Sequence, residues 1–147
     1  IWLQGIALRV DLLGLMSESV LLHTLAHIGE RTLATEEQPG ALRSAEVFLI
    51  IKKYIDDHFS NSELSLSHIG AVFNYNSKYL STAFKKHFKI GIAEYINTVR
   101  INYACELMRQ GYTGVTDIAS LCGYRDALYF SKVFKRMTGE SPKKYMS

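Results

Sequence analysis

The sequence predicts an all-helical protein with two similar subdomains, joined by a long linker helix and preceded by one or two amphipathic helices. Apolar residues recur at helical spacing along nearly the whole chain, and the alternating apolar and polar residues typical of strands are absent. Only Pro39 and Pro142 interrupt the 147 residues, so long helices meet few obstacles. A helical unit in residues 65–88 recurs near residues 115–138, which indicates an internal repeat.

Residues 1–34 are expected to form a separate helical region at the start of the chain. Charged residues and histidines interrupt its apolar stretch before it reaches the length of a membrane span, so we expect no membrane association. The chain begins at Ile1 and not at Met, and we interpret this region as the end of a longer upstream domain. A homodimer through residues 1–33 is an alternative that can coexist with this interpretation. Its contact would be a heptad-like row of residues, which Ser19 and Gly29 weaken. The row consists of Leu8, Leu12, Leu15, Ser19, Leu22, Ala26, Gly29 and Leu33.

A polar segment, residues 35–42, separates this region from the rest of the chain. It contains Pro39 and Gly40, which together mark a linker. The charge also changes here, because residues 1–42 hold two basic and five acidic side chains, a net charge of −3. Residues 43–147 hold fifteen basic and nine acidic side chains, a net charge of +6. Only this second part, 43–147, is therefore expected to meet a polyanion.

Helical periodicity and capping residues place the helices of this second part. A long helix is expected over 42–59, with an apolar face and with Lys52 among the charged residues that fall mostly elsewhere. Ser65 supplies an N-cap for a short helix over 66–73. The remaining helices are expected at 77–88, at about 92–110 and, after Ser141 and Pro142, at 143–146.

The two copies of the repeat each consist of a short helix, a tight turn and a longer helix. Gly70 and Ala119 put a small residue where a second helix must cross at close range. Asn74 and Gly123 stand at the turn, and these are the two residue types that best tolerate positive φ. A generic helical hairpin explains the amphipathic pattern but not these paired features, so the sequence predicts two helix-turn-helix units.

The second helix of such a unit enters the major groove of DNA, so its outward residues should be polar, small or basic. Lys78 and Lys132 can donate to guanine, and Leu128 can contact a thymine methyl group. The base-reading candidates are Ser77, Lys78, Ser81, Thr82, Ala127, Leu128, Ser131 and Lys132. The candidates for phosphate contacts, which give affinity without sequence preference, are Lys85, Lys86, Arg125, Lys135 and Arg136.

The helix between the copies sets how far apart the two units lie. Nineteen residues of helix span roughly 28 Å. This length is comparable with the roughly 34 Å between successive major-groove segments on one side of B-DNA. We therefore expect a sequence-specific, double-stranded DNA-binding protein that contacts two adjacent major-groove segments.

The sequence lacks the residue patterns typical of enzymes and metal-binding proteins. We find no paired carboxylates, no nucleophile beside a base and no phosphate-binding loop, so we expect no enzyme, no catalytic residue and no cofactor. The histidines make no metal-ligand pattern, although His23 and His27 are spaced i, i+4. Cys105 and Cys122 are isolated, and we interpret them as small core residues of a protein in a reducing compartment, the cytoplasm.

Residues 116–145, TDIASLCGYRDALYFSKVFKRMTGESPKKY, resemble the signature of the AraC/XylS family of bacterial transcription regulators. The resemblance covers about residues 43–147 and implies two helix-turn-helix units joined by a long helix. It also implies a transcription activator that binds promoter DNA and touches RNA polymerase, with a small-molecule effector bound only by the missing upstream domain. Asn74, Lys89 and Met146 depart from the family pattern, which commonly has Gly, Gly and Arg there.

One competing interpretation is a helical module that docks a protein through the same surface. Such a surface would carry large aromatic anchors, and Tyr79 and Tyr129 are residues of that kind. Lysine, serine and threonine surround them, which favours DNA.

Overall fold

The computed structural model describes residues 40–147, and their side chains from residue 45 onward. Helices make up this range, without any strand: α3 (Gly40–His58), α4 (Leu66–Phe73), α5 (Ser77–Phe88), α6 (Ile92–Arg109), α7 (Val115–Leu121), α8 (Ala127–Thr138) and α9 (Pro142–Met146). The all-helical fold class is thereby confirmed. The helices and heptad-like row expected in residues 1–33, and residues 35–39 of the expected linker, lie outside the described residues.

The helix ends agree with the expected ones to within two residues. Helix α3 begins at Gly40, so residues 40–42 of the segment expected to be a linker are helical. Helix α9 begins at Pro142, one residue before its expected start, because Ser141 caps it and Pro142 occupies the first helical position. A proline at that position loses no hydrogen bond, since its amide would have no partner in the helix.

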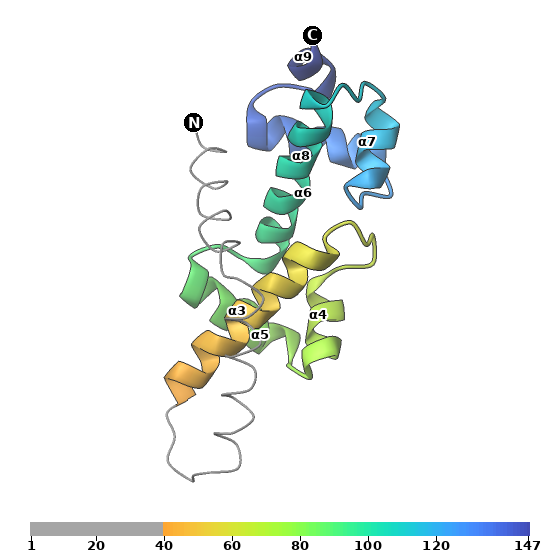
Figure 1. Ribbon diagram of the computed structural model, residues 1–147. Coiled ribbons are helices and arrows are strands. Elements are labelled where there is room, and N and C mark those ends of the chain that lie inside the picture. Colours follow the sequence, from red (N-terminus) through yellow and green to blue (C-terminus); the bar gives the residue numbers. More distant parts are fainter. Residues whose placement is uncertain (1–39) are drawn as a thin grey trace.

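Helix α6 connects the two halves of the described molecule, with α3, α4 and α5 grouped around its beginning and α7, α8 and α9 around its end (Figure 1). The first group and the first half of α6 form the first subdomain, and the second half of α6 with the second group forms the second subdomain. The core changes within one turn of α6, because Val99 belongs to the first core and Ile101 to the second.

The first core is built from the apolar faces of α3, α4, α5 and α6. Helix α3 contributes Phe48, Ile51 and Ile55, each at most 2% exposed. Lys52 does not lie on a polar face as the sequence suggested, because it is only 5% exposed and packs between the rings of Phe88 and Tyr95. The buried apolar residues are Phe48, Ile51, Ile55, Leu64, Ile69, Leu80, Phe84, Ile92, Tyr95, Ile96 and Val99.

The second core contains both cysteines, which are free and buried as expected. Met146, which replaces the Arg common in the family pattern, packs against this core. The buried residues are Ile101, Ala104, Cys105, Leu107, Ile118, Ala119, Cys122, Tyr124, Phe130, Val133, Phe134 and Met137. No helix of residues 40–147 is long and apolar enough to cross a bilayer.

Candidate nucleic-acid interface

The first helix-turn-helix unit consists of α4, a tight turn and α5. Asn74 adopts the left-handed conformation at the turn, with φ 57°, as the sequence predicted. The Tyr75 amide then donates to the carbonyl of Gly70 at 2.8 Å and closes the turn. A Cβ atom at Gly70 would lie 2.8 Å from the Tyr75 carbonyl oxygen. The close crossing of the two helices therefore requires a residue without a side chain at this position.

The second unit, α7, turn and α8, has the same geometry with different residues. Gly123 takes the left-handed position, with φ 91°, and the Tyr124 amide donates to the carbonyl of Ala119 at 2.9 Å. Ala119 is buried at the crossing, where its methyl group is accommodated. The two turns predicted from the repeat are therefore confirmed.

Helix α5 turns its apolar residues inward and a polar face outward. Leu80 and Phe84 are fully buried, while Lys78 and Thr82 are exposed and Ser77 and Ser81 half-buried. Asn76 caps the helix by accepting hydrogen bonds from the amides of residues 78 and 79. The Thr82 hydroxyl donates to the carbonyl of Lys78 at 3.0 Å. While that bond lasts, Thr82 can only accept a hydrogen bond from a base.

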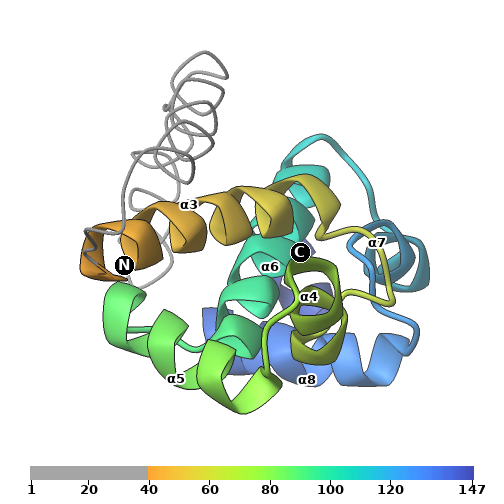
Figure 2. The same ribbon diagram turned by 90° about the horizontal axis from the view of Figure 1, so that it is seen from below.

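Helix α8 has the same construction, with an outward face that is less polar at its start. Leu128 is 76% exposed, although it is an apolar residue. Lys132 is exposed one turn further along, and Ala127 and Ser131 are half-buried. The Ser131 hydroxyl donates to the carbonyl of Ala127 at 2.9 Å. Both α5 and α8 lie along the edge of the molecule opposite α3 (Figure 2), so the two helices belong to one side.

The phosphate candidates fall into two groups. Lys85, Lys86 and Lys135 are exposed near the ends of α5 and α8. The two arginines instead form ion pairs between the subdomains: Arg125 pairs with Glu63, and Arg136 with Glu94 at 3.1 Å. These pairs could not be predicted from the sequence, because the partners are 62 and 42 residues apart.

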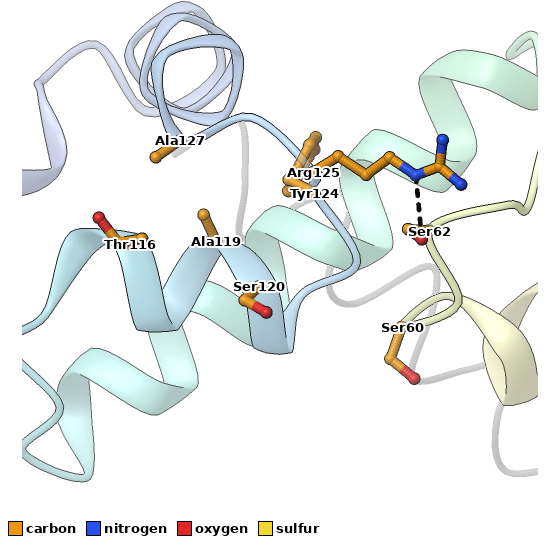
Figure 3. Close-up of a pocket in the computed structure, with 8 residues that line it drawn as sticks. All are labelled: Ser60, Ser62, Thr116, Ala119, Ser120, Tyr124, Arg125 and Ala127. Atoms are coloured by element: carbon orange, nitrogen blue, oxygen red, sulfur yellow. Dashed lines mark hydrogen bonds between the residues drawn. The ribbon is translucent and has the colours of Figure 1, made fainter.

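A pocket of about 380 Å³ opens beside Arg125, between the second helix-turn-helix unit and the α3–α4 loop (Figure 3). Its lining is mostly hydroxyl-bearing and small: Ser60, Ser62, Thr116, Ala119, Ser120, Tyr124, Arg125 and Ala127. Arg125 donates through Nε to the Ser62 hydroxyl at 3.4 Å. Because its guanidinium group also pairs with Glu63, the lining offers no unpaired charge to a ligand. Within residues 40–147 no three potential metal ligands gather.

Comparison with known proteins gives consistent results. The helix-turn-helix domain family matches residues 69–147. The chain is 33% identical, over 115 residues, to the uncharacterized HTH-type transcriptional regulator YijO of Escherichia coli strain K12, covering 78% of this chain and 40% of YijO. It is 34% identical over 92 residues to YtdP of Bacillus subtilis strain 168, another HTH-type transcriptional regulator, covering 63% of this chain and 12% of YtdP. The chain thus spans less than half the length of these relatives.

Two solved structures share the fold. The C-terminal domain of AraT, a response regulator from Geobacillus stearothermophilus, matches with a TM-score of 0.65 and 31% identity over 68% of this chain and 83% of that domain. The C-terminal domain of the response regulator yesN from Fusobacterium nucleatum matches with a TM-score of 0.64 and 30% identity, over 67% and 95%.

Two helix-turn-helix units around one shared helix define a tandem helix-turn-helix DNA-binding domain. The chain belongs to the AraC family of helix-turn-helix transcriptional regulators, as the resemblance of residues 116–145 implied. Family and fold point to a DNA-binding regulator and not to an enzyme.

Proposed function

We propose that the chain recognises double-stranded DNA by placing α5 and α8 in two adjacent major-groove segments. The observation that carries this proposal is the position of two helices with basic and small outward residues on one side of the molecule (Figure 2). Helix α6, with 18 residues, connects the two units and spans about 27 Å along its axis. Another structure of the same fold, at 18% identity, is the DNA-binding domain of AdpA in complex with a target DNA.

Helix α5 is proposed to contact the first segment through hydrogen bonds. Lys78 is exposed at the start of the helix, where it can donate to guanine O6 and N7. Ser77 and Ser81 are short enough to let the helix approach closely, and Thr82 offers a hydroxyl acceptor beside a methyl group. This helix therefore favours a segment that contains guanine.

Helix α8 is proposed to contact the second segment with apolar and basic residues together. Leu128 and Ala127, at its first turn, suit the methyl group of thymine. Lys132 suits guanine one turn later, and Ser131 can accept from a base amino group. The two segments should thus differ in sequence, and the whole site should be asymmetric.

Phosphate contacts are proposed for the exposed Lys85, Lys86 and Lys135. For Arg125 and Arg136 the same role requires that a phosphate replace Glu63 or Glu94 as the partner. Such exposed ion pairs are worth only about 0–1 kcal/mol, so the exchange is inexpensive.

The role in the cell is proposed from the family. A cytoplasmic transcription activator would bind promoter DNA through residues 43–147 and touch RNA polymerase. Residues 1–33 would provide a homodimer contact, and a small-molecule effector would act through the upstream domain.

Selection of sites from random duplexes, followed by titration of the selected duplex at several salt concentrations, tests the proposal. We expect a motif spanning two adjacent major-groove segments, with affinity that falls steeply as salt rises. A motif confined to one segment would contradict the tandem arrangement. No enrichment at low salt would favour the protein-docking alternative through Tyr79 and Tyr129, which are 50% and 52% exposed.

Lys132→Ala and Lys135→Ala form a matched pair on α8. Lys132→Ala should weaken binding to the selected site by about 1–3 kcal/mol and leave nonspecific binding nearly unchanged, because a base contact is lost. Lys135→Ala should weaken both alike and reduce the salt dependence, because a phosphate contact is lost. Equal losses on both duplexes for Lys132→Ala would reassign Lys132 to the phosphate backbone.

A further inference from the structure

Arg100 lies where α6 passes from one subdomain to the other. Val99 before it belongs to the first core, and Ile101 after it belongs to the second. Its side chain is buried, with 7% exposure for the residue. A buried arginine needs partners for its donors, so its contacts identify what it does in the fold.

The guanidinium group of Arg100 holds residues of both subdomains. Its Nε donates to the carbonyl of Phe59 at 2.8 Å, and a terminal nitrogen donates to the carbonyl of Asn61 at 2.9 Å. Both carbonyls belong to the α3–α4 loop of the first subdomain. The same group lies 5.1 Å from the ring centre of Tyr124, in the turn of the second helix-turn-helix unit. One side chain therefore connects that turn to the α3–α4 loop.

The turn also touches the loop directly. A Cβ atom at Gly123 would lie 2.6 Å from the Phe59 carbonyl oxygen and 3.0 Å from the backbone of Ser60. Only a residue without a side chain permits this approach. The Tyr124 hydroxyl donates to Asn97 of α6 at 2.8 Å and holds the ring under Arg100.

Two exposed ion pairs lie at the same boundary. Glu63 of the loop pairs with Arg125, which follows the turn, and Glu94 at the start of α6 pairs with Arg136 of α8. Each joins residues of different subdomains. The contacts of Arg100 and Gly123 do not depend on these ion pairs, and we name this set of contacts the Arg100 junction.

We propose that the Arg100 junction fixes the spacing and the rotational phase of the two DNA segments that the chain accepts, with Arg100 as the positioning residue. The inference rests on the proposed recognition of two segments by α5 and α8. Inserting one base pair between the segments displaces the second by about 3.4 Å along the axis and rotates it by about a tenth of a turn. If the junction is rigid, α8 no longer matches the displaced segment unless the DNA deforms, and this deformation costs free energy. A loosened junction lets the protein absorb it.

The test uses the whole 147-residue chain and the duplex obtained by site selection. Affinity is measured for that duplex, for duplexes with one base pair added or removed between the segments, and for duplexes with only one segment intact. The wild-type chain should bind the altered spacings at least about tenfold more weakly. Arg100→Met should reduce this penalty to within about threefold, while its affinity for single-segment duplexes stays at the wild-type level.

Arg109→Met is the matched control, because Arg109 is on the same helix but is exposed, and its partners Glu106 and Tyr145 both belong to the second subdomain. It should keep the wild-type dependence on spacing. Circular dichroism shows whether Arg100→Met folds, and Arg100→Lys replaces it otherwise, since it keeps the charge but has one nitrogen in place of the two that donate.

A folded Arg100 variant that retains the full spacing penalty would overturn the proposal. So would a wild-type chain that selects a two-segment site but tolerates altered spacing. A wild-type chain that selects no two-segment site would instead overturn the proposed function, and the inference with it.

Discussion

The two helix-turn-helix units have glycine at different positions: one at the helix crossing, the other in the turn. The first has Gly70 at the helix crossing and Asn74 in the left-handed conformation, whereas the second has Ala119 at the crossing and Gly123 in the left-handed conformation. The hydrogen bond that closes the turn is nevertheless almost the same, 2.8 Å against 2.9 Å. The difference follows from the surroundings: Asn74 is exposed, while Gly123 is buried against the α3–α4 loop.

The two subdomains also differ in their cores and in how their longer helices end. The first core encloses Lys52, whereas the second encloses two cysteines. Lys89 caps the end of α5 with φ 60°, and Gly139 caps the end of α8 with φ 88°. A lysine in this conformation is strained relative to glycine. The first subdomain therefore contains a buried lysine and a strained lysine, both of which reduce its stability, and the second subdomain has neither.

The largest effect is expected from the equivalent core residues Phe84 and Phe134, both fully buried. Phe84→Ala and Phe134→Ala should each lower the free energy of unfolding by about 3–5 kcal/mol, because each leaves a cavity. Amide hydrogen exchange should show the greater loss of protection in the subdomain that carries the substitution. Equal losses in both would mean that the subdomains unfold as one unit.

Gly70→Ala tests the difference at the helix crossing. The new Cβ atom would clash with the Tyr75 carbonyl, and we expect a loss of about 1–3 kcal/mol in the free energy of unfolding by urea. Gly91→Ala is the control, because no atom lies within 4 Å of its Cβ position, and it should change stability by less than about 1 kcal/mol. A gain in stability for Gly70→Ala, as helix propensity alone predicts, would contradict the close crossing.

Lys52→Met should stabilise the first subdomain by about 1 kcal/mol at neutral pH. The Lys52 ammonium group is buried without a hydrogen-bond partner, while the neighbouring Asp56 keeps the Tyr95 hydroxyl as a donor at 2.5 Å. Urea unfolding of the variant and the wild-type chain measures the gain. Lys53→Met, at an exposed ion pair on the same helix, is the control and should change stability by less than about 0.5 kcal/mol.

The gain from Lys52→Met should depend on pH. Burial lowers the pKa of Lys52 below its ordinary value of 10.5, so between the folded-state pKa and 10.5 the unfolded chain binds more protons. Wild-type stability from this group therefore rises with pH through that window, and the advantage of methionine shrinks. An advantage that stays constant up to pH 10.5 would show that the charge of Lys52 is not what destabilises the fold.

Lys89→Gly is expected to have the smallest effect, a gain of about 0.5–1 kcal/mol, because glycine adopts positive φ without strain. Lys86→Gly, inside the same helix, should instead cost about 1 kcal/mol. The midpoint of urea unfolding measures both. A loss of stability for Lys89→Gly would indicate that the Lys89 side chain makes a stabilising contact.

The sequence predicted the helices and both turns because these depend on neighbours in the chain. Helical periodicity, Ser65 and Ser141 as N-caps, and a residue tolerant of positive φ are local properties. The same reasoning placed Lys78, Leu128 and Lys132 on outward faces, where the structure has them exposed. Their contacts with bases remain predictions.

The interactions between the subdomains could not be predicted in this way. Arg125 and Arg136 were predicted to contact phosphate, yet each has an acidic partner far away in the sequence. The sequence assigned no role to Arg100, because its hydrogen-bond partners lie 41 and 39 residues away in the chain. Lys52 looked like a surface residue because its burial depends on α5 and α6.

By itself the sequence determined an all-helical fold class and a repeated helix-turn-helix unit, because both follow from local periodicity and spacing. It also indicated the AraC family, through the resemblance of residues 116–145 to the signature of that family. Only the tertiary structure decided how the two units face each other. That arrangement depends on Arg100, Gly123 and two ion pairs, whose partners are brought together by the packing of both cores around α6.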